Sequence, residues 1–262
     1  MKIADLDERD LPLYFVCLED WNDEMKEAGN LKEIWYKRMQ HRGLRVKLAV
    51  DDHGTVGGMI QYVPIESSFV DGKDLYFINC IWVHGYKHGR GDFRRHGMGK
   101  ALLDAAEGDA RALGSKGIAA WGLLLPFFMR ASWFRRHGFR TVDRNGMQAL
   151  MWKPFTTDAV PPKWIRGKFR PELKDDKVTV TAFCSGWCPG QNLTFERAKR
   201  AAAEPQFEGK VEFCSFDTFD REDVRRCGIS DALFIDKKHV WSGPPPSYEK
   251  IRKLISKRVN EL

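Results

Sequence analysis

Residues 94–100 combine residue types that suit the binding of a phosphate group. This run, Arg-Arg-His-Gly-Met-Gly-Lys, follows an apolar stretch at 75–83 that predicts a buried strand, and a helix is expected to begin within it. The first N–H groups of a helix lack backbone partners, and the helix dipole is positive at that end. Gly97 and Gly99 would let a ligand approach this backbone without an intervening Cβ. The sequence therefore predicts an anion site at this strand-to-helix junction.

Two cysteines in the last third of the chain form a second chemical candidate. Cys184 ends a predicted strand and Cys188 precedes a predicted helix, within the run Phe-Cys-Ser-Gly-Trp-Cys-Pro-Gly-Gln at 183–191. A thiol at a helix N-terminus is favoured as the nucleophilic thiolate. Three uses stay open: a Cys188 nucleophile, a Cys184–Cys188 redox pair, or a docking domain whose cysteines do no chemistry. We predict no metal site, because no second Cys/His pair stands at zinc spacing.

The composition indicates a globular protein without a membrane or nucleic-acid partner. The chain has 262 residues, 43% of them hydrophobic, yet its longest apolar runs are shorter than the roughly 18 residues of a membrane span. The first ten residues are too polar for a secretion signal, so we expect a cytoplasmic protein whose six cysteines are free thiols. The 43 Lys and Arg residues are scattered among 36 Asp and Glu residues without a basic block, which argues against nucleic acid. The oligomeric state stays open.

The elements that must position residues 94–100 follow the order β-α-α-β-β-β-α-β-α-β. Hydrophobic periodicity and turn residues place them as follows. Strands are expected over 2–6, 44–50, 56–63, 75–83, 118–125 and 148–153, and helices over 11–20, 31–41, 97–113 and 129–137. Gly114 is expected to end the third helix.

A change of character at 156–176 separates two expected domains, 1–155 and 177–262. This connector is basic and punctuated by prolines, and Trp164, Ile165 and Phe169 could pin it against a domain. Beyond it the order is β-α-β-α-β-β-α. Strands are expected over 178–183, 211–216, 232–236 and 239–242, and helices over 192–204, 221–227 and 247–262.

The pattern Arg-x-x-Gly-x-Gly at 94–99, followed later by a short helix ending in Gly138-Phe139, resembles the GNAT acetyltransferases. The resemblance covers roughly residues 1–155 and implies an α/β (α+β) fold, a mixed sheet flanked by helices. It also implies transfer of an acetyl group from acetyl-CoA, as co-substrate, to a primary amine of a small molecule or peptide. No metal takes part in this chemistry.

The same resemblance assigns roles to individual residues. Backbone amides at Trp82 and Val83 would hold the pantetheine of coenzyme A. The residues that would lie under its pyrophosphate are Arg94, Arg95, His96, Gly97, Met98, Gly99 and Lys100. Phe134 stands where the family often has a tyrosine that protonates the leaving thiolate, so Ser132 or a water would have to substitute. The candidates for a general base are Glu66 and His84.

Residues 84–92 lengthen the link between the strand and the anion-binding loop beyond the family's usual turn. They form either a flexible surface insertion or a lid over coenzyme A or substrate, in which Lys87 and Arg90 would face phosphate.

The second domain resembles the thioredoxin fold, a small α/β domain. Aligning Trp187 with the tryptophan of that family puts Cys188 at the nucleophilic position and Gln191 at the resolving one. Asp231 falls where that family has a cis-proline, so an ordinary dithiol oxidoreductase is not expected. With Trp-Cys-Pro-x-Gln-Asn at 187–192, the whole chain resembles bacterial acetyltransferases that carry a YoaP-type C-terminal domain.

Two further functions remain as alternatives to acetyl transfer. The chain could be a coenzyme A-binding sensor or docking protein without transfer activity, which the phenylalanine at 134 favours. It could also be a thiol-active protein centred on Cys188.

Overall fold

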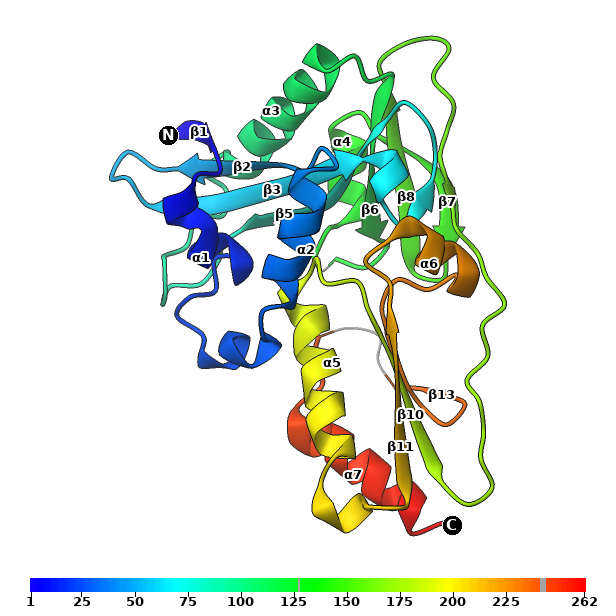
Figure 1. Cartoon of the computed structure of the whole chain (residues 1–262). Helices are drawn as coiled ribbons and strands as arrows, with labels where there is room; N and C mark the ends of the chain where they lie inside the picture. Colours follow the sequence, from blue (N-terminus) through cyan, green and yellow to red (C-terminus); the bar gives the residue numbers. More distant parts are fainter. Residues whose placement is uncertain (127, 241–243) are drawn as a thin grey trace. The chain divides into compact units, whose positions relative to one another are not determined.

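The computed structural model describes residues 1–126, 128–240 and 244–262, which divide between two compact units (Figure 1). The first unit contains residues 1–21 and 36–165, and the second contains residues 22–35 and 166–262. The chain therefore enters the second unit twice. Among the described residues, no helix is long and apolar enough to cross a membrane.

The first unit is a seven-stranded sheet with helices on both faces. Its strands are β1 (Lys2–Asp5), β2 (Arg45–Val50), β3 (Val56–Pro64), β5 (Tyr76–Val83), β6 (Gly117–Leu123), β7 (Arg140–Asn145) and β8 (Gln148–Pro154). Its helices are α1 (Leu11–Phe15), the later part of α2 (Leu31–Gln40), α3 (Met98–Ala112) and α4 (Ala131–Arg136). The strand order is β1-β2-β3-β5-β6-β8-β7, in which β5 and β6 are parallel and the other pairs antiparallel. The expected mixed α/β sheet flanked by helices is confirmed.

Side-chain alternation along β3 shows which helices cover which face of this sheet. A Cβ on Gly58 would lie 3.0 Å from Leu102 of α3, whereas Gln61 points the other way and accepts a hydrogen bond from Tyr14 of α1 (Oη–Oε1, 2.8 Å). Tyr14 in turn packs edge-on against Tyr36 of α2. Helix α3 therefore covers one face, and α1 and α2 cover the other.

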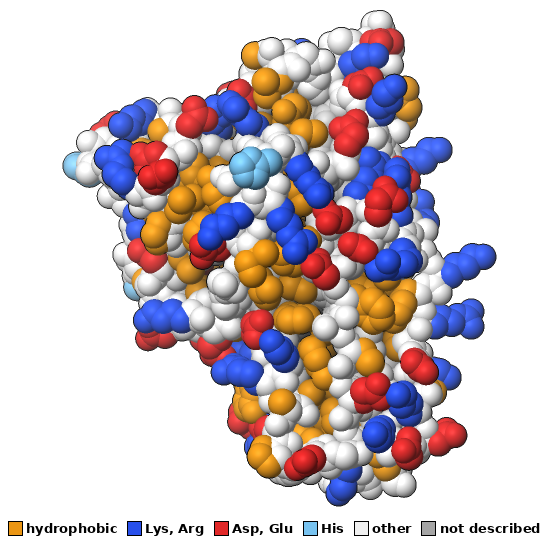
Figure 2. Space-filling view, viewed as in Figure 1, with side chains coloured by type: hydrophobic (Ala, Val, Ile, Leu, Met, Phe, Trp, Pro, Cys, Tyr) orange, Lys and Arg blue, Asp and Glu red, His pale blue; other side chains and the backbone are white. Residues whose placement is uncertain are grey.

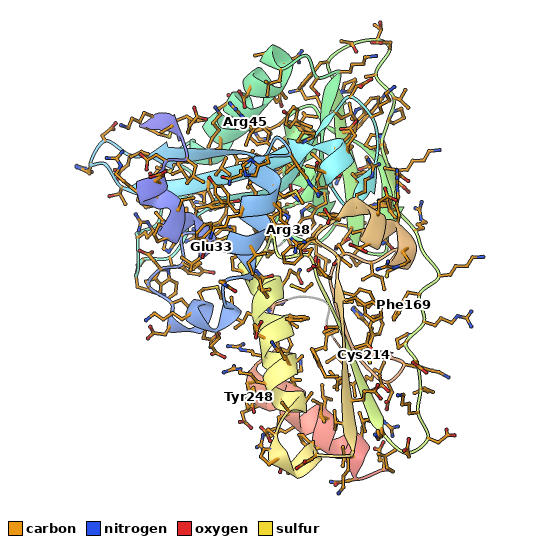
Figure 3. The ribbon with its side chains drawn as sticks, in the orientation of Figure 1. Glu33, Arg38, Arg45, Phe169, Cys214 and Tyr248 are labelled. Carbon is orange, nitrogen blue, oxygen red and sulfur yellow. The ribbon has the colours of Figure 1, made fainter. Side chains whose placement is uncertain are left out.

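A polar network fixes α3 to the sheet. Asp109 of α3 accepts hydrogen bonds from Tyr62 Oη (2.6 Å) and from Arg45 Nε (2.9 Å) and Nη2 (3.2 Å), and Arg45 points toward α3 in Figure 3. Burial and the neighbouring Asp109 carboxylate raise the pKa of Tyr62, so its hydroxyl stays a proton donor. The network fixes the C-terminal part of α3 to β2 and β3.

Parts of the first unit differ from the sequence prediction, including the short strands β4 (Val70–Asp71) and β9 (Lys163–Trp164) described below. The helix expected over 11–20 ends at Phe15, because Cys17 and Leu18 adopt left-handed conformations (φ 51° and 66°) that turn the chain. Strand β7, over 140–145, was not expected, because it lies at the sheet edge and its exposed, polar residues give no apolar alternation.

The second unit contains a four-stranded sheet with the order β11-β10-β12-β13. Its elements are β10 (Val178–Cys184), α5 (Pro189–Ala202), β11 (Val211–Asp217), α6 (Arg221–Cys227), β12 (Ala232–Ile235), β13 (Lys238–His239) and α7 (Tyr248–Val259). Strands β10 and β11 are parallel, and β12 is antiparallel to both β10 and β13. The expected strand over 239–242 lies partly outside the described residues.

Residues 22–35 belong to this second unit and contain the 3-10 helix η2 (Asp23–Ala28). Arg197 of α5, whose side chain is 5% exposed, forms ion pairs with Glu24 (3.2 Å) and Glu27 (3.3 Å). Arg200 also pairs with Glu27. The early segment thus supplies the counter-charges of a buried guanidinium.

The connector is anchored at two places. In the first unit, β9 (Lys163–Trp164) pairs with β4 (Val70–Asp71). In the second unit, Phe169 packs against Phe183 and Phe216, at 4.8 and 5.3 Å between ring centroids.

Candidate active site

Strand β5 parts from β6 halfway along its length. In the described part of the sheet, β6 pairs with β5 only through Tyr76–Ile78, although β5 stays paired with β3 as far as Val83. The parting coincides with a β-bulge at Asn79, where the register between β3 and β5 shifts. Bulges bend a strand, so the bulge explains why the second half of β5 leaves its neighbour.

The backbone N–H groups of β5 beyond the bulge alternate between two directions. The backbone N–H of His84 donates to the carbonyl of Gly57 on β3 (N–O, 2.9 Å). The N–H of Trp82, two residues earlier, therefore also faces β3. The N–H groups of Ile81 and Val83 therefore face the β6 side, and that of Ile81 donates to Met129 Sδ at 3.4 Å. Ile81 was not named from the sequence, because only the observed register tells which amides face the opening.

The N-terminus of α3 lies next to this open side. Gly97 is its N-cap in a left-handed conformation (φ 81°), and among the described residues no side chain caps the helix and no acid stands in its first turn. A Cβ on Gly97 would meet no atom within 4 Å, and one on Gly99 would lie 3.8 Å from Val83. The end of β5 and the bare helix amides are thus adjacent, as an extended ligand with a phosphate would require.

The basic side chains of the loop differ in their partners. Arg94 binds Asp92 through two hydrogen bonds (2.8 and 2.6 Å), and its guanidinium holds the pKa of that carboxyl well below the usual range. Lys100 pairs with Asp104, while Arg95 and His96 are exposed. Elsewhere, on the face shown in Figure 2, Lys and Arg side chains are interspersed with Asp and Glu.

Comparison with known proteins identifies the family. Residues 2–139 match the family model described as Acetyltransferase (GNAT) family. The chain belongs to this family. Its members transfer an acyl group from an acyl-CoA, so the opening beside β5 and the amides of α3 are parts of a GNAT acetyltransferase.

Individual relatives are distant. The Bacillus subtilis (strain 168) protein called uncharacterized N-acetyltransferase YoaP is 25% identical over 185 residues, which cover 66% of this chain and 67% of that protein. A GNAT acetyltransferase from Brucella melitensis in complex with acetyl-CoA has a TM-score of 0.41 at 17% identity, covering 61% of this chain and 90% of its own. The Escherichia coli GNAT protein YhbS in complex with CoA has a TM-score of 0.43 at 15% identity, covering 62% and 88%.

The structure of the acetyltransferase places Glu66 away from the opening of β5. Glu66 is exposed in a 3-10 turn after β3 and accepts a hydrogen bond from the Asp74 amide (3.0 Å). Pro64, two residues earlier, pairs with Tyr76 at the beginning of β5. Since a strand rises about 3.3 Å per residue, Tyr76 alone is roughly 16 Å from Ile81. Glu66 is not brought to the opening.

His84 is fully buried, and both of its ring nitrogens have partners. Nε2 accepts a hydrogen bond from Trp21 Nε1 (2.9 Å), and Nδ1 donates to the Gly91 carbonyl (2.6 Å) in the tautomer that satisfies both contacts. In this arrangement the imidazole has no nitrogen left for a substrate proton. Its contacts instead hold residues 84–92 in place.

The remaining catalytic candidates of the acetyltransferase lie on α4. Ser132 is exposed in the first turn of this helix. Phe134 is fully buried against Trp133 and Phe139, so the position where the family often has a tyrosine belongs to the core here.

The insertion at 84–92 is a packed structure in this acetyltransferase. Gly85 and Asp92 form an isolated β-bridge, and the ring of Trp21 contacts those of Tyr86 and His88. Arg90 donates to Asp20 (3.0 Å) and to the Val56 carbonyl (2.9 Å). Its guanidinium is therefore engaged away from the loop at 94–100.

The six cysteines are free thiols in the structure, and the two in the second unit's motif differ in environment. Cys184 is buried and donates weakly to Asn192 Oδ1 (3.5 Å), and burial raises the pKa of its thiol, which disfavours the thiolate. Cys188 is half-buried and is the N-cap residue of α5. No three His, Cys, Asp or Glu side chains gather as a metal site within the described ranges.

Asp231 is the most perturbed carboxyl of the second unit. It accepts hydrogen bonds from the amide (3.1 Å) and hydroxyl (2.8 and 2.9 Å) of Ser185, and burial raises its pKa from 3.8 to about 6. The folded unit therefore binds a proton that the unfolded chain has lost, so its stability falls as the pH rises through this window. We expect Asp231→Asn to remove this pH dependence of stability. The free energy of opening of the variant minus that of the native protein should therefore rise by about 1–3 kcal/mol between about pH 4 and pH 7.

Hydrogen exchange of the β10 amides measures this difference. Because the same pH steps are applied to both proteins, other titrating groups cancel. Parallel pH profiles for the two proteins would show that Asp231 is not the titrating group.

Proposed function

We propose that this GNAT protein transfers an acetyl group from acetyl-CoA to a primary amine of a small molecule or peptide. The observation that carries the proposal is the adjacency of the open side of β5 and the uncapped first turn of α3. The Ile81 and Val83 amides would hold the pantetheine, and the backbone of residues 94–100 would hold the pyrophosphate. Gly97 leaves space for this, since a Cβ there would meet no atom within 4 Å.

Acetyl-CoA supplies the activated thioester, and the chain supplies position and amide N–H groups. An N–H of β5 that faces the opening can donate to the thioester oxygen as negative charge develops there. Met129 has to leave the Ile81 amide for that residue to serve. The amine nitrogen forms the new C–N bond, the C–S bond breaks, and its electron pair goes to sulfur. Holding the two reactants together supplies most of the rate gain.

No tyrosine stands at position 134 to protonate the leaving CoA sulfur. Because Phe134 is buried and lacks a hydroxyl, the proton has to come from the attacking nitrogen, from water or from Ser132. The exposure of Ser132 in the first turn of α4 is compatible with this role.

Calorimetry with acetyl-CoA and CoA tests the proposal, together with mass-spectrometric detection of acetylated products in a panel of primary amines. We expect saturable binding with a Kd between about 1 μM and 1 mM and acetylation of some amine class. Absence of acetyl-CoA binding by the native protein would overturn the proposal.

The buried Phe134 favours one alternative, a coenzyme A-binding sensor without transfer activity. It predicts binding of acetyl-CoA of the same strength but no acetylation of any amine in the panel.

We further propose that the second unit is thioredoxin-like. Support comes from its element order β-α-β-α-β-β-α, from the parallel β10–β11 pair beside antiparallel β12 and β13, and from Cys188 at the start of α5. A thiol function centred on Cys188 would require a lowered thiol pKa. The rate of alkylation against pH, with Cys188→Ser as control, measures it, and a value near the ordinary 8.5 or so would remove this function.

A further inference from the structure

The turn that follows α1 brings Glu19 to the end of β5. Trp21, two residues after Glu19, donates a hydrogen bond to Nε2 of His84, the residue that follows β5 (2.9 Å). Cys17 and Leu18 are consecutive non-glycine residues in left-handed conformations (φ 51° and 66°), and Leu18 is fully buried. Residues other than glycine rarely adopt this backbone conformation, and it persists only where the surrounding structure imposes it. Such sites cluster where a protein has to aim a functional group.

The carboxylate of Glu19 is half-buried among aromatic rings. The indole groups of Trp21 and Trp82 and the imidazole of His84 lie close enough to Glu19 to influence its ionisation. Trp82 Nε1 is buried and makes no hydrogen bond among the described residues. Burial raises the pKa of Glu19, although the indoles and His84 oppose this effect. Glu19 is therefore a carboxylate kept partly out of water.

This cluster lies where the reacting atoms would be. Trp82 stands between Ile81 and Val83 on β5, the two residues whose amides face the opening. Since Val83 faces α3, alternation turns Trp82 to the other face of the sheet, where α1 lies. Coenzyme A would extend from this point toward α3, so an acceptor can approach from the Glu19 side.

Aromatic rings continue along the same opening. The ring of Trp82 is 5.6 Å from that of Phe128, which is 5.8 Å from that of Trp121 on β6. Aromatic faces next to a carboxylate attract an ammonium group, both by the ring quadrupole and by charge.

We propose that Glu19 binds the acceptor's ammonium group and takes its first proton. This inference rests on the proposed acetyl transfer. The step converts R–NH₃⁺ and the Glu19 carboxylate into R–NH₂ and the carboxylic acid, which then releases its proton to solvent. The neutral amine attacks the thioester carbon, the C–S bond breaks, and the second nitrogen proton goes to the CoA sulfur. The products are the acetamide and CoA thiol.

The alternative bases fit this position less well. Glu66 lies at the far end of β5, and both nitrogens of His84 are already bonded. Glu19 has neither restriction. Its own amide donates to Val16, which leaves the carboxyl group to the cluster.

The test compares Glu19→Gln with a matched variant, Glu66→Gln. Both replace one carboxylate by an amide of the same shape, but only the first lies at the opening. With the best amine of the panel, we expect Glu19→Gln to lower kcat/KM about 100-fold or more, because general-base catalysis contributes about 10²–10⁴-fold. Glu66→Gln should stay within about twofold of the native protein, and both should bind acetyl-CoA normally by calorimetry.

A pH profile separates proton transfer from a structural role. The charged or titratable groups around the cluster are His84, Asp20 with its partner Arg90, and Tyr86 and His88 on the ring of Trp21. The acidic limb of kcat/KM that Glu19 causes should persist in Glu19→Asp, which should recover part of the rate, and disappear in Glu19→Gln.

Two results would overturn the inference while acetyl transfer by the native protein stays intact. These are full activity of Glu19→Gln, or equal losses in Glu19→Gln and Glu66→Gln. If the native protein acetylates no amine, or does not bind acetyl-CoA at all, it is the proposed function that fails.

Discussion

Replacement of Gly97 by tryptophan is expected to raise the Kd for acetyl-CoA by about 1,000-fold, or about 4 kcal/mol. Gly97 caps α3, and a Cβ there would point into open space, where the pyrophosphate is proposed to lie. An indole would fill this space and cover the first-turn N–H groups. Titration calorimetry with acetyl-CoA measures the effect.

Gly114 provides the matched control for this variant. It ends the same helix with a similar φ (77°, against 81° for Gly97), and a Cβ there would also meet no atom within 4 Å. Gly114→Trp therefore carries the same backbone strain and the same added bulk, but at the negative end of the dipole. It should bind acetyl-CoA like the native protein. Equal losses in the two variants would show that strain, not obstruction, weakens binding.

Replacement of Gly228 by alanine is expected to destabilise the second unit by about 3–5 kcal/mol. Gly228 ends α6 in a left-handed conformation (φ 73°), and a Cβ there would lie 1.9 Å from the amide nitrogen of Gly167 and 2.3 Å from its Cα. Neither contact can be relieved by rotating a side chain, because both atoms belong to the backbone. The connector next to Phe169 would have to move away from α6.

Gly209 separates this clash from backbone strain. It has the same φ of 73° in the same unit, with nothing within 4 Å of its Cβ position. Gly209→Ala should therefore cost only about 1–2 kcal/mol, the penalty of the left-handed conformation. Hydrogen exchange of the β10 amides reports both effects, and the β6 amides serve as a reference in the first unit. Similar costs for the two variants would mean that the backbones separate easily at Gly167.

The glycine-capped start of α3, where we propose that the pyrophosphate binds, could be predicted from the sequence because its signal is local. Gly97, Gly99 and the following helix are neighbours in the chain, and a helix N-terminus binds anions wherever it stands. The resemblance to the GNAT family implies an opening between two parallel strands, but no residue pattern places it on β5. It depends on a bulge at Asn79, which arises from the pairing register with β3, and no residue type announces it.

The candidate base was also beyond the reach of sequence patterns. A helix was expected to continue through Glu19, which would have placed this residue on a regular helical face. The left-handed turn at Cys17 and Leu18 instead ends the helix before Glu19, which lies near Trp82, a residue more than sixty positions later. The sequence indicates Glu66 and His84 because they stand at strand ends. Strand ends can be recognised in a sequence, but distances between them cannot.

The second unit is built from two separate segments of the chain, which restricts how it can be produced in isolation. A recombinant fragment that starts at the connector would lack Glu24 and Glu27, so Arg197 would lose both ion-pair partners and α5 would lose its packing against η2. Removal of the partners of a buried ion pair is costly. Excision at a single cut would thus yield a polypeptide prone to misfolding. A designed fragment should graft residues 22–35 back, by fusion or as a separate peptide.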